Sequence, residues 1–82
     1  MEKINVDQLL SIISEGLNIP AEKLSLDSSS ENIDEWDSLG QLGILSCLDK
    51  NIDGNIAELS DLGKAESVNT IMQILESNGY IK

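Results

Sequence analysis

Apolar residues recur at intervals of three and four in three stretches of the chain, the spacing that places them on one face of an α-helix. The first stretch contains Val6, Leu9, Leu10, Ile13 and Leu17. The second contains Leu39, Leu42, Leu45 and Leu48, with Ile44 beside them. The third contains Val68, Ile71, Met72 and Leu75, with Ile74 at its margin. The pattern therefore predicts three amphipathic helices.

Polar residues at the ends of these stretches predict where the first and last helices begin. Asn5 and Gln8 have the spacing of a capping box, so we expect a first helix at about residues 5–16. Gly16 is a plausible C-terminal stop for it, because glycine often follows the last helical residue. Ser67 is a typical N-cap for the last helix.

The connections between the helices contain turn-forming and polar residues. Pro20 should begin one short turn, after which Leu24 and Leu26 are expected to point back to the core. Residues 27–34 are mostly Ser, Asp, Glu and Asn, a composition typical of a loop. We expect Trp36 to fold this long loop onto the helices, because its ring can bury a large area.

A second polar connection follows the middle helix. Residues 53–55 are Asp, Gly and Asn, which favour a turn. Residues 57–62 form a segment too short for a full helix, and Gly63 follows it as a stop. This segment therefore predicts one or two helical turns. The sequence thus predicts an all-α fold, a small four-helix bundle with three main helices and a short third helix, in one domain that spans residues 1–82.

Composition agrees with a small aliphatic core. The chain has 82 residues, of which 40% are apolar, with one Trp, one Tyr and no Phe. Its single cysteine, Cys47, has no partner for an internal disulfide, and we expect it to be a small buried residue. No apolar run is long enough for a signal peptide or a membrane span, so we expect a soluble cytoplasmic protein.

The charge of the chain restricts its partners and its chemistry. Fifteen acidic and five basic residues give a formal net charge of −10, which repels nucleic acid and anionic membranes and attracts basic protein surfaces. The absence of histidine excludes a Ser-His-Asp hydrolase and a histidine-containing metal site. With no second nucleophile and base either, we expect that the protein is not an enzyme.

Residues 35–39, Glu-Trp-Asp-Ser-Leu, contain the start of the middle helix, which should run from Ser38 to about Asn51. Asp37 is suited to be its N-cap, so the Ser38 hydroxyl lies at the positive end of the helix dipole. Unpaired backbone N–H groups at such an end stabilise a phosphate group. Ser38 is therefore a candidate attachment site for a phosphate-linked group.

Asp37, Ser38 and Leu39 at the start of the second helix of a small acidic helical chain resemble the acyl carrier protein family. The resemblance covers nearly the whole chain. It implies that Ser38 carries 4′-phosphopantetheine from coenzyme A, whose thiol holds acyl or aminoacyl groups as thioesters. It also implies that Asp37 helps to position a magnesium ion transiently during modification, with no resident metal predicted, and that Leu39 is partly exposed beside the arm.

The resemblance implies partners as well. These are a phosphopantetheinyl transferase, an acyl- or aminoacyl-loading enzyme, and downstream transferases with basic surfaces, all acting on a monomeric carrier. The expected partner-binding residues are Glu35, Asp37, Leu39, Gly40 and Gly43. The common family motif has acidic residues where this chain has the two glycines, so we predict a carrier for a specialised biosynthetic pathway. The glycines should also mark a close approach of another backbone or of the arm.

In the family, the bundle core shields the attached chain. The candidates for lining such an interior cavity are Leu42, Ile44, Leu45, Leu48, Ile71 and Leu75. The identity of the cargo stays open at this point among fatty acyl, hydroxyacyl and aminoacyl groups.

Two alternatives remain. Residues 49–56 match the first eight positions of a calcium-binding EF-hand loop, including the glycine at position six, Gly54. Position twelve is Ser60 instead of a bidentate glutamate, and Glu58 comes two residues early. A calcium-binding protein that uses the 49–60 loop is therefore one alternative. The other is an unmodified carrier-like module that interacts only through its surface.

Overall fold

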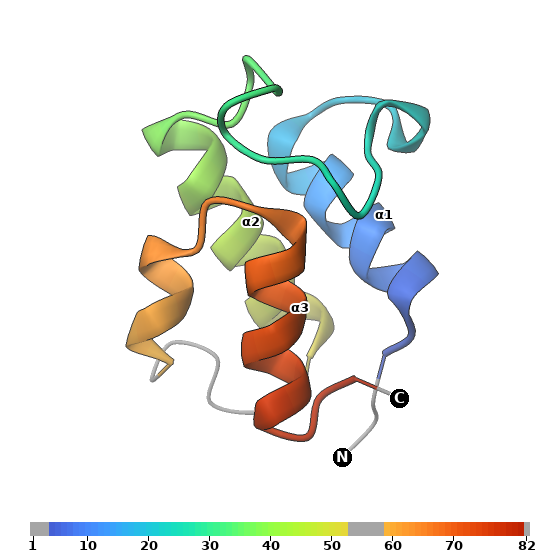
Figure 1. Cartoon of the computed structure of the whole chain (residues 1–82), viewed down its shortest axis with the longest axis vertical. Coiled ribbons are helices and arrows are strands. Elements are labelled where there is room, and N and C mark those ends of the chain that lie inside the picture. The colour runs from blue at the N-terminus through green and yellow to red at the C-terminus, as the bar shows by residue number, and fades with distance from the viewer. Residues whose placement is uncertain (1–3, 53–58, 82) are drawn as a thin grey trace.

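The computed structural model describes residues 4–52 and 59–81. Within them the chain is mostly helical and its only β-type pairings are two isolated bridges, so the predicted all-α class is confirmed (Figure 1). The α-helices of this part are α1 (Val6–Leu17), α2 (Ser38–Asn51) and α3 (Val68–Ser77). Its connections contain two short 3-10 helices, η1 (Ala21–Lys23) and η3 (Ser60–Lys64).

Helix α1 begins as predicted but ends later. The Gln8 N–H donates to Asn5 Oδ1 at 2.7 Å and the Asn5 N–H donates to Gln8 Oε1 at 2.9 Å, which confirms the capping box. The helix ends at Leu17, and Asn18 closes it in the left-handed conformation with φ of 59°. Asparagine tolerates this conformation better than most residues. The prediction that Gly16 stops α1 is therefore wrong.

Gly16 instead serves the packing of α1 on α2. A Cβ atom at Gly16 would lie 2.6 Å from the Ile44 Cα atom and 2.8 Å from the Gly43 carbonyl carbon. Real side chains do not approach a backbone so closely, so glycine lets the two helices come together here. Helix α1 packs along α2, and this pair makes the most extensive contact between helices in the described part of the chain.

The core lies between α1, α2 and α3 and is built almost wholly from aliphatic side chains. Its most deeply buried members include Leu9, Ile13, Ile44, Leu48, Ile71 and Leu75. The two ends of the described chain meet beside it, because Ile4 forms a parallel bridge with Ile81 (Figure 1). The predicted apolar faces of α1 and α3 share this core, but the face predicted for α2 does so only in part. Ile44 and Leu48 are buried and Leu45 packs against the core. Leu39 and Leu42, in contrast, are exposed.

The long connection between α1 and α2 is pinned to the start of α3. Ser29 forms an antiparallel bridge with Ser67, and the Val68 N–H donates to the Ser28 carbonyl oxygen at 3.0 Å. The predicted short turn is present as η1, and Leu24 is buried as expected. Leu26 is 46% exposed, so the prediction that it points to the core is wrong. It lies in a turn that faces solvent.

The short element before α3 is present with shifted bounds. It forms at Ser60–Lys64, so Gly63 lies inside it and does not end it as predicted. The turn predicted at residues 53–55 lies outside the described residues. Ser67 caps α3 as predicted, since its side chain accepts from the Thr70 N–H at 3.1 Å. No helix in the described ranges is long and apolar enough to cross a membrane.

Candidate functional site

Asp37 caps the start of α2. Its backbone is extended, and its Oδ1 atom accepts a hydrogen bond from the Gly40 N–H at 2.9 Å. The predicted N-cap is therefore confirmed. This cap satisfies one of the N–H groups that have no partner within the helix. The N–H groups of Ser38 and Leu39 belong to the same first turn and point out of its open end.

Ser38 is the first residue of α2 and is exposed. Glu35, Asp37 and Leu39 are exposed beside it. The Leu39 side chain is 79% exposed, in agreement with the exposure that the family resemblance implies, although the apolar pattern placed it on the apolar face of the helix. Leu42, one turn further along α2, is 60% exposed. The start of α2 thus presents a hydroxyl group next to two carboxylates that precede the helix and two exposed apolar side chains on it.

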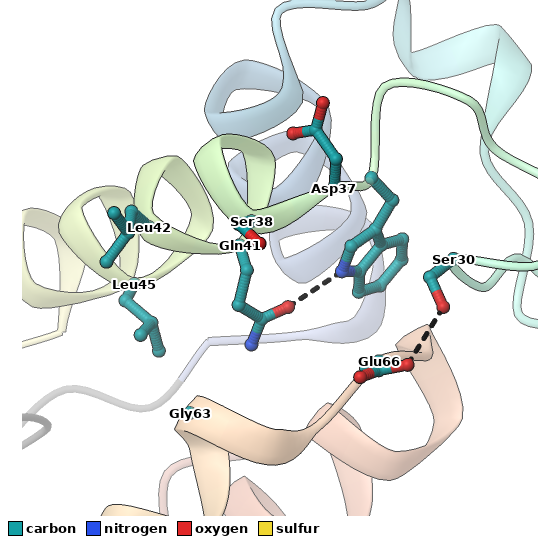
Figure 2. A pocket seen from close by; sticks show the side chains of 9 residues that line it. Ser30, Asp37, Ser38, Gln41, Leu42, Leu45, Gly63 and Glu66 are labelled. Atoms are coloured by element: carbon teal, nitrogen blue, oxygen red, sulfur yellow. Dashed lines mark hydrogen bonds between the residues drawn. The ribbon is translucent and has the colours of Figure 1, made fainter.

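The exposed start of α2 borders a groove of about 620 Å³ (Figure 2). Its described lining residues are Ser30, Trp36, Asp37, Ser38, Gln41, Leu42, Leu45, Gly63 and Glu66. They come from the long loop, from α2, from η3 and from the residues that lead into α3. None of them is Lys or Arg, so the charge in this lining is wholly negative.

Gln41 joins three segments at the inner end of the groove. Its Oε1 atom accepts from the Trp36 indole Nε1–H at 2.7 Å (Figure 2). Its Nε2 atom donates to the Leu62 carbonyl oxygen at 2.7 Å. Trp36 is only 4% exposed. The expectation that Trp36 folds the long loop onto the helices is confirmed, and Gln41 connects that ring to η3.

Ser30 and Glu66 meet on the facing wall. The Ser30 hydroxyl donates to Glu66 Oε2 at 3.1 Å (Figure 2). The Ser30 N–H donates to the Glu66 carbonyl oxygen at 2.8 Å. Sequence reasoning identified neither residue, nor Gln41. The only sequence feature at Ser30 is a run of three serines, which gives no indication of a partner 36 residues away.

Gly40 and Gly43 mark close approaches of the backbone, as predicted. A Cβ atom at Gly40 would meet the Glu35 carbonyl oxygen and lie 2.7 Å from a Leu17 methyl carbon. A Cβ atom at Gly43 would meet the Gly16 carbonyl oxygen. Gly40 is buried and Gly43 half-buried, so both lie toward α1. Of the expected partner-binding residues, the exposed ones are Glu35, Asp37 and Leu39.

The residues predicted to line an interior cavity divide into two groups. Leu42 and Leu45 line the groove at the surface. The other four, Ile44, Leu48, Ile71 and Leu75, are at most 1% exposed and pack against one another in the core, and none of them lines this groove. The six residues do not share one lining in the described groove, because α2 turns Leu42 and Ile44 to different sides. An interior cavity around an attached chain stays a prediction.

Cys47 and the acidic residues form no second centre in the described part of the chain. Cys47 packs against the core as expected, but it is half-buried and not fully buried. No group of three or more Cys, Asp or Glu residues in this part could hold a metal ion. Asp49 and Asn51 lie in α2, and the Asn51 amide donates to the Cys47 carbonyl oxygen at 2.7 Å. Most of the remaining EF-hand-like loop, residues 53–58, lies outside the described residues.

Comparisons of the chain with protein-family models, with curated proteins and with solved structures gave no match.

Proposed function

We propose that this protein is an acyl carrier whose Ser38 bears a 4′-phosphopantetheine arm. The observation that carries the proposal is the exposed hydroxyl of Ser38 as the first residue of a capped α-helix, between Asp37 and a 79% exposed Leu39, at the edge of a groove. The resemblance of these three residues to the carrier family motif supports the same reading. The arm would hold its cargo as a thioester and present it to partner enzymes.

The residues around Ser38 suit a phosphate ester. When the arm is attached, the Ser38 Oγ atom is bonded to phosphorus in place of its proton, and the remainder of coenzyme A leaves. The first-turn N–H groups and the helix dipole stabilise the negative phosphate without a basic side chain nearby. Asp37 keeps the helix start in place through Gly40 and is the residue suited to a magnesium ion during modification. The transferase supplies the phosphoryl-transfer chemistry.

The proposal includes a finer description of the fold and of the partner surface. We propose that the three α-helices, with η3 as the short third helix, make up the four-helix arrangement of a carrier. Glu35, Asp37 and Leu39 form the surface offered to partner enzymes with basic patches. Helix α2 has no charged residue between Ser38 and Leu48, so we propose that the clients are enzymes of a specialised cytoplasmic pathway.

The decisive experiment is intact mass spectrometry after incubation with coenzyme A, magnesium and a broad-specificity phosphopantetheinyl transferase. We expect the mass to rise by one phosphopantetheine group in the wild type and to stay unchanged in Ser38→Ala. Ser46→Ala is the matched control, because Ser46 is also exposed on α2 but lies away from the helix start, and it should be modified like the wild type. An unmodified wild type, or equal modification of Ser38→Ala, would refute the proposal.

A further inference from the structure

We propose that this carrier holds a short or polar acyl group in the groove beside Ser38, and that Gln41 is the specificity-determining residue that keeps long aliphatic chains out of the core. The inference rests on the proposed function of Ser38. It goes beyond that function because it names the class of cargo and the residue that selects it.

Gln41 closes the seam between α2 and η3. Both ends of its amide are engaged, with Oε1 on the Trp36 indole and Nε2 on the Leu62 carbonyl, each at 2.7 Å. The Leu62 side chain is 1% exposed, so this bond anchors η3 where it covers the core. An acyl chain that entered between α2 and η3 would have to separate Gln41 from Leu62.

Opening this seam would leave polar groups without partners. Trp36 is only 4% exposed and its Nε1–H group is partly buried, so water has little access to this N–H group. Breaking the two hydrogen bonds would strand an indole N–H and a carbonyl oxygen next to an aliphatic chain, which cannot accept or donate. Ile44 and Leu48, further along the same helix, are fully buried and already packed in the core. Both the hydrogen bonds of Gln41 and the packed core residues therefore oppose the entry of a long acyl chain.

The groove itself offers surroundings for a different kind of cargo. The Ser30 hydroxyl and the Glu66 carboxylate face it from one wall, while Leu42 and Leu45 form an apolar strip on α2 (Figure 2). Because the groove is open to solvent, a long aliphatic chain lying in it would keep much of its apolar surface in water. A short acyl group leaves little apolar surface in water there. An acyl group that carries a hydroxyl or an amine can also form hydrogen bonds with Ser30 and Glu66.

The first test compares acetyl, 3-hydroxybutyryl and octanoyl groups loaded on the wild-type protein through its own arm. For each group, the rate of thioester hydrolysis is divided by the rate of the same group on free pantetheine. We expect the octanoyl ratio to be no lower than the acetyl ratio, and the amide NMR shifts of Ile44 and Leu48 to be independent of chain length. An octanoyl thioester that is protected, with shifts in these core amides, would overturn the inference.

The second test removes the two hydrogen bonds in Gln41→Leu, with Gln73→Leu on the exposed side of α3 as the matched control. In Gln41→Leu we expect the ratio of the octanoyl to the acetyl hydrolysis rate to fall by about 25-fold, because each of the two lost hydrogen bonds contributes a factor of about five. Gln73→Leu should behave like the wild type. Equal rates of octanoyl hydrolysis in both variants and the wild type would show that Gln41 does not select the cargo.

These outcomes separate the two proposals. If the transferase does not modify Ser38, the carrier function itself fails. If Ser38 is modified but octanoyl enters the core of the wild type, only the inference about the cargo fails. Should Gln41→Leu not fold, the wild-type chain-length series still decides the class of cargo.

Discussion

The carbonyl oxygen of Gly16 in α1 lies so close to Gly43 of α2 that a Cβ atom at Gly43 would clash with it. The Gly16 carbonyl carbon is 3.1 Å from the position of that Cβ atom. Two helix backbones are therefore in direct contact, and the start of α2, with Ser38, is held against α1 at this crossing. Glycines that weaken an isolated helix here allow the packing that places the candidate site.

Gly43→Ala tests this contact. Alanine should strengthen the isolated helix, but the clash with a backbone atom cannot be relieved by a side-chain rotation, so we expect the free energy of unfolding to fall by about 1–3 kcal/mol. Gly63→Ala is the control, because a Cβ atom there meets nothing within 4 Å. Urea unfolding followed by circular dichroism measures both. A Gly43→Ala protein as stable as Gly63→Ala would contradict the close approach.

Trp36→Phe tests the connection between the long loop and η3. The phenyl ring still fills much of the buried site but cannot donate to Gln41, so the loss of the hydrogen bond should cost about 1 kcal/mol, with a further loss from the smaller ring. Thermal unfolding measured by circular dichroism gives the change. Tyr80→Phe, at a buried position beyond the end of α3, provides a comparison in which the Trp36–Gln41 hydrogen bond is kept. An unchanged stability of Trp36→Phe would mean that the indole bond contributes nothing.

Asp37→Ala and Asp37→Asn separate capping from charge. Alanine removes the acceptor for the Gly40 N–H and should lower the free energy of unfolding by about 1 kcal/mol. Asparagine keeps an acceptor, so its stability should remain near that of the wild type. Under the proposed function, both variants should be modified more slowly by the transferase, because each lacks the carboxylate that suits magnesium. Normal modification of Asp37→Asn would show that only the cap matters.

Leu39→Ser should affect recognition without affecting folding. Its side chain is 79% exposed, so we expect a stability change within about 0.5 kcal/mol. Under the proposed function, kcat/KM for the transferase should fall because an apolar partner contact is lost. Ile44→Ala, a fully buried position on the same helix, should instead lower stability by about 2–5 kcal/mol. Wild-type kinetics in Leu39→Ser would remove this residue from the partner surface.

Features that depend on neighbouring residues could be predicted from the sequence. The spacing of apolar residues located α1, α2 and α3, and the caps at Asn5, Asp37 and Ser67 were placed correctly. These features follow from helix geometry and from hydrogen bonds that span three residues, which are the same in any tertiary setting. The exposure of Leu39 was implied by the family resemblance and not by the apolar pattern, which placed this residue on the apolar face of α2.

The errors occurred where packing overrides a local preference. Glycine commonly ends helices, so Gly16 was expected to end α1. The helix instead continues to Leu17 and is closed by Asn18, because Gly16 is needed where α1 crosses α2. Leu26 has an apolar side chain, yet it lies in a turn that places it in solvent. Neither outcome can be read from neighbouring residues, because each depends on where a distant segment lies.

The sequence by itself determined the helical class, the helix starts and the placement of Ser38 beside Asp37 at the positive end of a helix, because these depend on local periodicity and charge. The tertiary structure alone decided which groups face Ser38 across the groove. Gln41 meets Leu62 across 21 residues and Ser30 meets Glu66 across 36. Such contacts form only when helix packing brings distant segments together, since no short-range pattern specifies them.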